Sequence, residues 1–147
     1  MGVNQDQALW VPDAAHVAAT NMAAFTARAR ILSGRPLESH AALHEWSVHS
    51  PVQFWRLVWE FCEVLGEQGV RGLIRSGGMQ DSRWFPDASL NFAENLLRDS
   101  DNPQALVFWG EDKIRQSLSR QELRTEVARF AAALSAAGVE QGDRVAA

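Results

Sequence analysis

The spacing of apolar and polar positions predicts that the chain starts with an amphipathic helix. Between residues 13 and 33, apolar side chains recur at the three- and four-residue intervals of a helix. Gly34 and Pro36 follow and end the pattern. The stripe predicted to face inward consists of Met22, Phe25, Ala29 and Leu32.

Two further helices are predicted in this half of the chain. Ser39 is a suitable N-cap for a short helix whose Leu43 and Trp46 face inward. Residues 50–53, Ser-Pro-Val-Gln, supply a cap, a proline at the first helical position and a capping-box glutamine for the next helix. The inward stripe of that helix is predicted to be Phe54, Trp55, Val58, Trp59, Cys62 and Leu65.

The pattern then becomes irregular. Residues 66–83 are rich in glycine and predict a loop connection with one short strand at Leu73–Ile74. Trp84-Phe85-Pro86 introduces a turn, and a short helix is expected at about residues 91–98. Residues 99–103, Asp-Ser-Asp-Asn-Pro, form the clearest candidate boundary, because all five favour loops.

After this boundary the pattern is typical of a mixed α/β fold. Residues 105–109 and 114–118 read as a hairpin, and Ser119 with Glu122 forms a capping box that opens a helix ended by Gly138. The buried stripe of this helix is predicted to be Leu123, Val127, Phe130, Ala131 and Leu134. Residues 144–147 look like the first residues of a strand. Because a strand, a helix and the start of another strand are only part of an α/β domain, we expect the polypeptide to be the beginning of a longer chain.

Composition narrows the class of protein. The chain has 147 residues, of which 46% are apolar and 22% charged, so wholesale disorder is excluded. Its net charge of −4 argues against a nucleic-acid or anionic-membrane partner. Cys62 is the single cysteine, and neither a signal peptide nor a membrane-spanning stretch is present, which predicts a cytoplasmic chain.

Two histidine patterns invite a metal site, but neither supports one. The segment His44 to His49 has the form HExxxH, and its five-residue spacing separates the two rings around a helix. His40 and His44 share a helix face, yet no third ligand follows at a familiar spacing. We therefore predict no metal-binding residue.

Other candidate chemistry is equally incomplete. Residues 75–78, Arg-Ser-Gly-Gly, suggest an anion-binding nest, but a surface turn is the better interpretation. A P-loop is excluded because it needs a lysine after its glycines, and the only lysine is Lys113. Ser76 is not in a nucleophile elbow. Cys62 on an apolar helix face is expected to pack as a small hydrophobe. We predict no catalytic and no cofactor-binding residue in this chain.

Several stretches nevertheless resemble one family. They are Asn21-Met22-x-x-Phe25, Leu43-His44-Glu45-Trp46-Ser47-Val48, Phe54-Trp55-x-x-Val58-Trp59-x-Phe61, and Trp84-Phe85-Pro86-x-Ala88-x-Leu90-Asn91-Phe92-Ala93-Glu94-Asn95-Leu96-Leu97. Together they resemble the amino-terminal segment of the acetoacetyl-CoA synthetases, acyl-CoA ligases of the adenylate-forming superfamily. The resemblance spans about residues 9–147.

The resemblance implies an organisation and an activity. It implies an α/β fold, mainly α in this segment, with a helical cap over residues 1–103 and the start of a truncated adenylation (AMP-binding) domain over residues 104–147. The parent enzyme would use ATP, Mg²⁺ and CoA to ligate acetoacetate, and its catalytic and binding residues would lie beyond Ala147. The partner of this segment would be the remainder of the adenylation domain.

The resemblance also gives the tryptophans a role. Trp46, Trp55, Trp59 and Trp84 would act as docking anchors of the cap rather than as substrate contacts. Two alternatives stay open: a ligase for another short acid such as acetate or propionate, and a helical interaction module without catalytic function.

Overall fold

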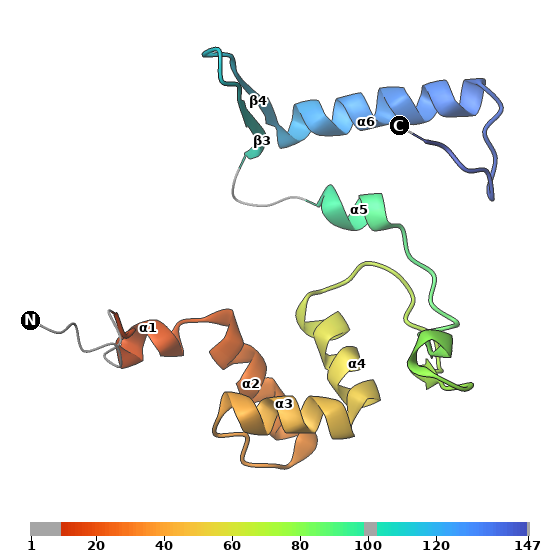
Figure 1. The fold of residues 1–147 in the computed structure, drawn as a ribbon. Coiled ribbons are helices and arrows are strands. Elements are labelled where there is room, and N and C mark those ends of the chain that lie inside the picture. Colours follow the sequence, from red (N-terminus) through yellow and green to blue (C-terminus); the bar gives the residue numbers. More distant parts are fainter. Residues whose placement is uncertain (1–9, 99–102, 147) are drawn as a thin grey trace, which may run out of the picture. The chain divides into compact units, whose positions relative to one another are not determined.

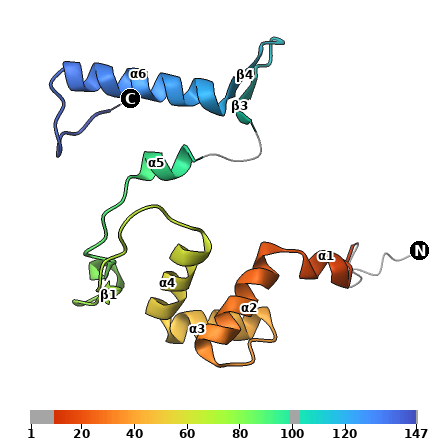
Figure 2. The same ribbon diagram turned by 180° about the vertical axis from the view of Figure 1, so that it is seen from behind.

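A computed structural model describes residues 10–98 and 103–146 of the chain. Backbone contacts divide it into two compact units, one ending at Leu90 and the other beginning at Asn91. Among the described residues, the first unit holds helices α1–α4 and a two-stranded sheet, and the second holds a hairpin with helices α5 and α6. Figure 1 and Figure 2 show these elements from opposite sides.

The first unit begins with two helices, α1 (Ala14–Ala18) and α2 (Asn21–Ser33). The prediction of one continuous helix over residues 13–33 is therefore wrong. Thr20 has an extended backbone, and its side chain accepts a hydrogen bond from the Ala23 amide (3.2 Å). A threonine that caps in this way starts a new helix, because its own backbone has left the helical conformation.

Helices α3 (His40–His49) and α4 (Pro51–Phe61) share the residue between them. Ser39 caps α3 as predicted. Ser50 is the N-cap residue of α4 and Pro51 its first residue, as predicted, but the predicted capping box does not form. Ser50 also closes α3, because its amide donates to the Trp46 carbonyl (2.8 Å). Its backbone angles, φ −127° and ψ 53°, are not those of a regular cap, and its side chain makes no capping hydrogen bond.

The core of the first unit lies among α2, α3 and α4. Its buried apolar residues are Phe25, Ala29, Leu37, Leu43, Trp46 and Leu57. This confirms the predicted inward positions on α3, whereas Met22 and Leu32 of the α2 stripe are exposed. The core is therefore narrower than the sequence pattern indicates.

Helix α4 departs most from its predicted stripe. Phe54, Leu57, Val58 and Phe61 pack on the core, although the stripe omitted Leu57 and Phe61. A different side of the helix, carrying Trp55 and Trp59, contacts aromatic rings of the following hairpin. A helix covered on two sides has no single apolar stripe, which is the reason the periodicity misassigned these positions.

The glycine-rich stretch forms one arm of an antiparallel hairpin. The predicted strand is confirmed as β1 (Leu73–Ile74), and it pairs with β2 (Arg83–Trp84). Further from the tip, Glu67 and Ser89 exchange two backbone hydrogen bonds, with N···O distances of 2.8 and 2.9 Å. The two arms therefore stay paired well beyond the short strands.

Close backbone packing explains a glycine in this arm. Gly69 has φ +73°, and a Cβ added there would lie 2.5 Å from the Asp87 Cβ and 2.9 Å from the Asp87 carbonyl carbon. Both the left-handed conformation and the lack of space require glycine at this position.

The second unit contains the predicted hairpin and helix. Strand β3 (Gln104–Trp109) pairs antiparallel with β4 (Arg115–Ser119), and α6 (Arg120–Ala136) follows directly. The predicted capping box is confirmed, because the Ser119 side chain accepts from the Glu122 amide (3.2 Å) and the Glu122 carboxylate accepts from the Ser119 amide (2.8 Å).

Two arginines of α6 explain why the short helix α5 (Phe92–Leu96) belongs to this unit. The Arg124 side chain donates to the Leu97 carbonyl (2.9 Å), and the Arg120 side chain donates to the Arg98 carbonyl (3.4 Å). These carbonyls follow the carboxy-terminal end of α5, where the helix itself supplies no donors. The side chains of α6 thereby hold α5 in place.

Two other predictions for the second unit, the buried stripe of α6 and the carboxy-terminal strand, are not met. None of its described residues is buried, so the predicted buried stripe of α6 is wrong within this unit; Phe130 is 61% exposed. Residues 144–146 form no strand. A strand needs a hydrogen-bonded neighbour, and no described segment pairs with these residues.

The boundary predicted at residues 99–103 falls largely outside the described residues, which stop at 98 and resume at 103. A domain division at residue 103 thus stays a prediction.

Gly69 provides a test of the hairpin packing. We expect Gly69→Ala to lower the free energy of unfolding by more than Gly34→Ala. Gly34 also has positive φ (+65°), but no atom lies within 4 Å of its added Cβ, so its variant should lose only about 1–2 kcal/mol for the left-handed conformation. Urea unfolding of both variants measures the difference. Equal losses would contradict the close approach to Asp87.

Candidate functional site

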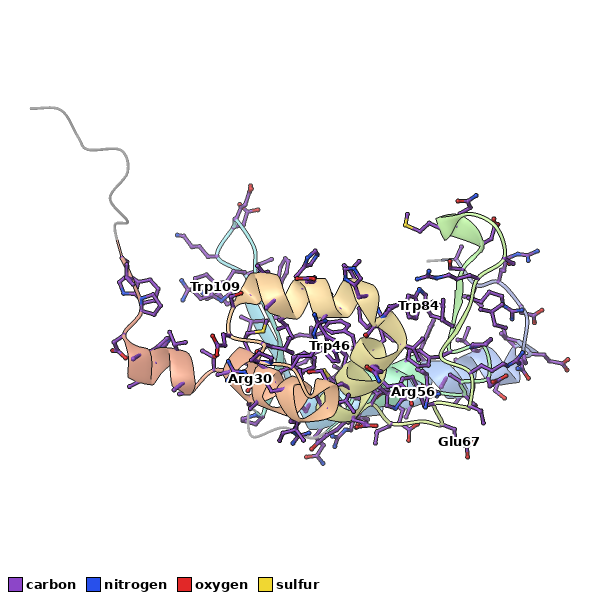
Figure 3. The ribbon with its side chains drawn as sticks, turned by 90° about the horizontal axis from the view of Figure 1, so that it is seen from below. Arg30, Trp46, Arg56, Glu67, Trp84 and Trp109 are labelled. Carbon is purple, nitrogen blue, oxygen red and sulfur yellow. The ribbon has the colours of Figure 1, made fainter. Side chains whose placement is uncertain are left out.

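A network of aromatic contacts joins the helices of the first unit to the hairpin. The Phe54 ring lies 5.7 Å from Phe25, 5.9 Å from Trp46 and 5.3 Å from Trp55, measured between centroids, each in an edge-to-face arrangement. Trp55 then contacts Trp84 of β2 at 6.1 Å. Ring contacts therefore run without interruption from α2 to the sheet, and Figure 3 labels Trp46 and Trp84 at different points of this network.

A second set of contacts holds the hairpin against α4. The Trp59 ring lies 5.7 Å from the Phe85 ring, and the Arg56 side chain donates a hydrogen bond to the Val70 carbonyl. Figure 3 labels Arg56 on α4. Phe85 has φ +42°, which is uncommon for a bulky residue and indicates that its surroundings fix its conformation.

The hairpin arms are also joined by an ion pair that the sequence analysis missed. The Arg71 Nε lies 3.0 and 2.9 Å from the two carboxylate oxygens of Asp87, and the Arg71 amide donates to the same carboxylate (3.2 Å). Arg71 stands in no motif, Asp87 is an unspecified position of the stretch that begins at Trp84, and 16 positions separate the two. Only the pairing of the two arms, which sequence periodicity does not reveal, brings them together.

This ion pair shifts the titration of both groups. The hydrogen bond from Arg71 lowers the pKa of Asp87 from 3.8 to about 2, and the same hydrogen bond raises the pKa of Arg71. The carboxylate is therefore charged throughout the physiological range and holds the two arms together there.

The glycine turn at residues 75–78 does not present an open anion nest. The Gly78 amide donates to the Asp81 carboxylate (3.1 Å), and the Ser76 hydroxyl donates to the Asp81 carbonyl (3.3 Å). Asp81 belongs to the 3₁₀ turn Met79–Asp81 at the tip of the hairpin. The Gly78 amide, which an external phosphate would need as a donor, is therefore already bonded to the carboxylate of Asp81. This arrangement is that of a surface turn.

The histidines lie on α3 without a metal arrangement. His40 and His44 both border a groove between α2, α3 and α4, and the His49 ring contacts the Glu45 carbonyl (2.8 Å). Within residues 10–98 and 103–146, no group of three or more His, Cys, Asp or Glu side chains converges to hold a metal ion. The prediction that the chain supplies no metal ligand stays open to experiment.

Cys62 is not placed as predicted, whereas Trp46 has the inward position that the helix pattern predicted. Cys62 follows α4, is exposed and lines the same groove rather than packing in the core. Trp46, predicted as a docking anchor, is 1% exposed and belongs to the unit's own core, whereas Trp55 and Trp84 keep 44% and 42% of their surface exposed. Trp46 is buried because α2, α3 and α4 contribute side chains to the same core. Among the described residues, no helix has the length and apolar character needed to cross a bilayer.

Comparison with known proteins shows that the chain is similar to part of several larger enzymes. An acetoacetyl-coenzyme A synthetase of Rhizobium meliloti is 46% identical over 142 residues, which is 97% of this chain and 22% of that enzyme. An acetoacetyl-CoA synthetase of Macaca fascicularis is 36% identical and is matched over 95% of this chain and 21% of its own length. The solved structure of an acetoacetyl-CoA synthetase from Streptomyces lividans superposes with a TM-score of 0.81 at 39% identity, covering 95% of this chain and 22% of that one. No family model matches the chain.

In these matches the chain corresponds to the amino-terminal segment of larger enzymes, which belong to the acyl-CoA ligases. More narrowly, it is a homologue of the amino-terminal segment of the acetoacetyl-CoA synthetases, as the sequence motifs indicated. The chain spans about a fifth of the length of the relatives that it matches.

The two tryptophan environments differ enough to be separated by mutation. We expect Trp46→Ala to lower the free energy of unfolding by about 3–5 kcal/mol, because it removes a buried ring and leaves a cavity. Trp55→Ala should cost less, because 44% of its surface is already exposed. Equilibrium unfolding in urea measures both losses. A smaller loss for Trp46→Ala than for Trp55→Ala would contradict the assignment of Trp46 to the core.

The Arg71–Asp87 pair predicts an acid-sensitive hairpin. Because folding lowers the pKa of Asp87 to about 2 from 3.8, its contribution to stability is complete above pH 3.8 and is lost as the pH falls toward 2. Asp87→Asn should therefore reduce the urea midpoint at pH 7 and flatten its fall between pH 4 and 2. Arg71→Gln should have the same effect, since it removes the same pair. Identical acid profiles for wild type and Asp87→Asn would refute this role.

Proposed function

We propose that the chain is the amino-terminal part of an ATP-dependent ligase that converts acetoacetate, ATP and CoA to acetoacetyl-CoA, AMP and pyrophosphate. The observation that carries this proposal is a match over 97% of the chain to an acetoacetyl-coenzyme A synthetase at 46% identity. The solved relative supports it, because its backbone follows the same course at a TM-score of 0.81.

The reaction proceeds in two steps. The carboxylate of the acid attacks the α-phosphate of ATP and releases pyrophosphate, and the CoA thiol then displaces AMP from the acyl group. Mg²⁺ supplies charge neutralisation at the phosphates. The described residues offer no cluster for the metal and no open anion nest at the glycine turn, so we assign no residue of this chain to ATP, Mg²⁺ or CoA.

The contribution of this segment is structural. The aromatic network and the hairpin ion pair give the first unit a fixed shape, and the exposed apolar residues of the second unit give it surface for further packing. We propose that both units pack against the remaining part of the ligase, with the second unit forming the beginning of the adenylation domain. A cytoplasmic location belongs to the same proposal and is supported by the single cysteine.

An exchange assay tests the proposal. With labelled pyrophosphate, ATP and Mg²⁺, the full-length protein should form labelled ATP in the presence of acetoacetate, because adenylation is reversible. The 147-residue chain alone should give the same signal as a blank without protein. The same assay with acetate and with propionate shows which of the three acids the full-length protein activates.

Each outcome has a defined meaning. Acetoacetate-dependent exchange by the 147-residue chain would overturn the structural role. A full-length protein that exchanges only with acetate or propionate would overturn the choice of acid and leave the ligase class intact. A full-length protein that exchanges with none of the three acids would favour the helical interaction module.

A further inference from the structure

A groove of about 350 Å³ lies between α2, α3 and α4 and is not used by the unit's own fold. Its apolar lining comes from all three helices and consists of Met22, Phe25, Leu43, Phe54, Val58 and Phe61. His40, His44 and Cys62 also line it. Among the described residues that line it, none is Asp, Glu, Lys or Arg.

This composition is that of the centre of a protein–protein interface. Such centres are rich in aromatic residues and methionine and poor in charged residues, and their rims are polar. Met22 is 56% exposed, and Phe54 and Phe61 are only partly buried although both pack on the core. An exposed apolar surface rimmed by polar residues is typical of an interaction site.

The substrates of the proposed reaction are poor occupants of this groove. Acetoacetate, ATP and CoA all carry negative charge, and a buried anion needs a charged or hydrogen-bonding partner. The groove has hydrogen-bonding side chains in Asn21, His40, His44 and Ser47, but no lysine or arginine lines it to pair with a phosphate or carboxylate, and most of its lining is apolar. Apolar side chains of a polypeptide, in contrast, match the apolar part of the lining.

The length of the relatives indicates where such a polypeptide comes from. The chain spans 22% of the matched Rhizobium meliloti enzyme and 22% of the solved Streptomyces lividans enzyme. Under the proposed function, most of the ligase therefore lies outside the 147 residues described above. We propose that the groove between α2, α3 and α4 receives an apolar segment of that remaining part, an inference that rests on the proposed function.

The rate at which a reagent labels the Cys62 thiol measures whether the groove is occupied. Cys62 is the only cysteine of the chain, it is exposed, and it lines the groove. We expect N-ethylmaleimide to label Cys62 about tenfold more slowly in the full-length protein than in the 147-residue chain, because the docked segment must open first. Mass spectrometry of the peptide that contains residue 62 measures the rate in both.

A matched pair of variants tests whether the groove itself is responsible. Met22→Glu places a charge at the groove mouth, in the first turn of α2, where an acidic residue is favourable. In the full-length protein it should restore fast labelling of Cys62. Ile31→Glu lies on the same helix, is 84% exposed and does not border the groove, and it should leave the slow rate unchanged. Circular dichroism of both variants confirms that α2 is still folded.

Other occupants give different results, and each would overturn the proposal. Protection that requires added acetoacetate, ATP or CoA would identify a ligand. Protection of the 147-residue chain that grows with its concentration would identify a second copy. Equal labelling rates in both proteins would show an open groove. Because exchange activity is measured separately, a protected Cys62 in an inactive protein would refute the proposed function alone.

Discussion

The first unit depends on the ring of Phe54. This ring contacts Phe25, Trp46 and Trp55 at centroid distances between 5.3 and 5.9 Å, so one side chain of α4 joins two other helices and the route to the hairpin. Each edge-to-face contact adds about 0.5–1.5 kcal/mol to the free energy gained by burial. The three helices are short, and this shared ring gives them a common core.

The hairpin of residues 67–89 is held together by its own contacts and packs against α4 through aromatic rings. Its arms approach so closely at Gly69 that a side chain there would meet the Asp87 backbone, and Arg71 closes the arms with a charged hydrogen bond. Trp55 and Trp59 then fix the hairpin against α4. A stretch whose composition is typical of a flexible connection is thus a structural element, because Gly69 permits close packing of the two arms.

Sequence reasoning succeeded where the signal is local. The caps at Ser39 and Ser119, the strand at Leu73–Ile74 and the β3–β4 hairpin depend on a few neighbouring residues, and all are present. It failed where two elements compete for one residue, as in the capping box expected at Ser50, or where a helix is covered on two sides, as in α4. The Arg71–Asp87 pair and the groove were missed because their residues lie far apart in the chain.

Sequence alone specified the starts of α3 and α6, the mixed character of the carboxy-terminal part and the likeness to acetoacetyl-CoA synthetases, because motifs and caps are properties of neighbouring residues. The tertiary structure decided which tryptophans are core and which are surface. Trp46 and Trp55 are equally apolar and both lie on helices, yet the packing of three helices buries the first and leaves the second 44% exposed. Burial depends on what packs against a residue, and neighbouring positions in the sequence do not specify it.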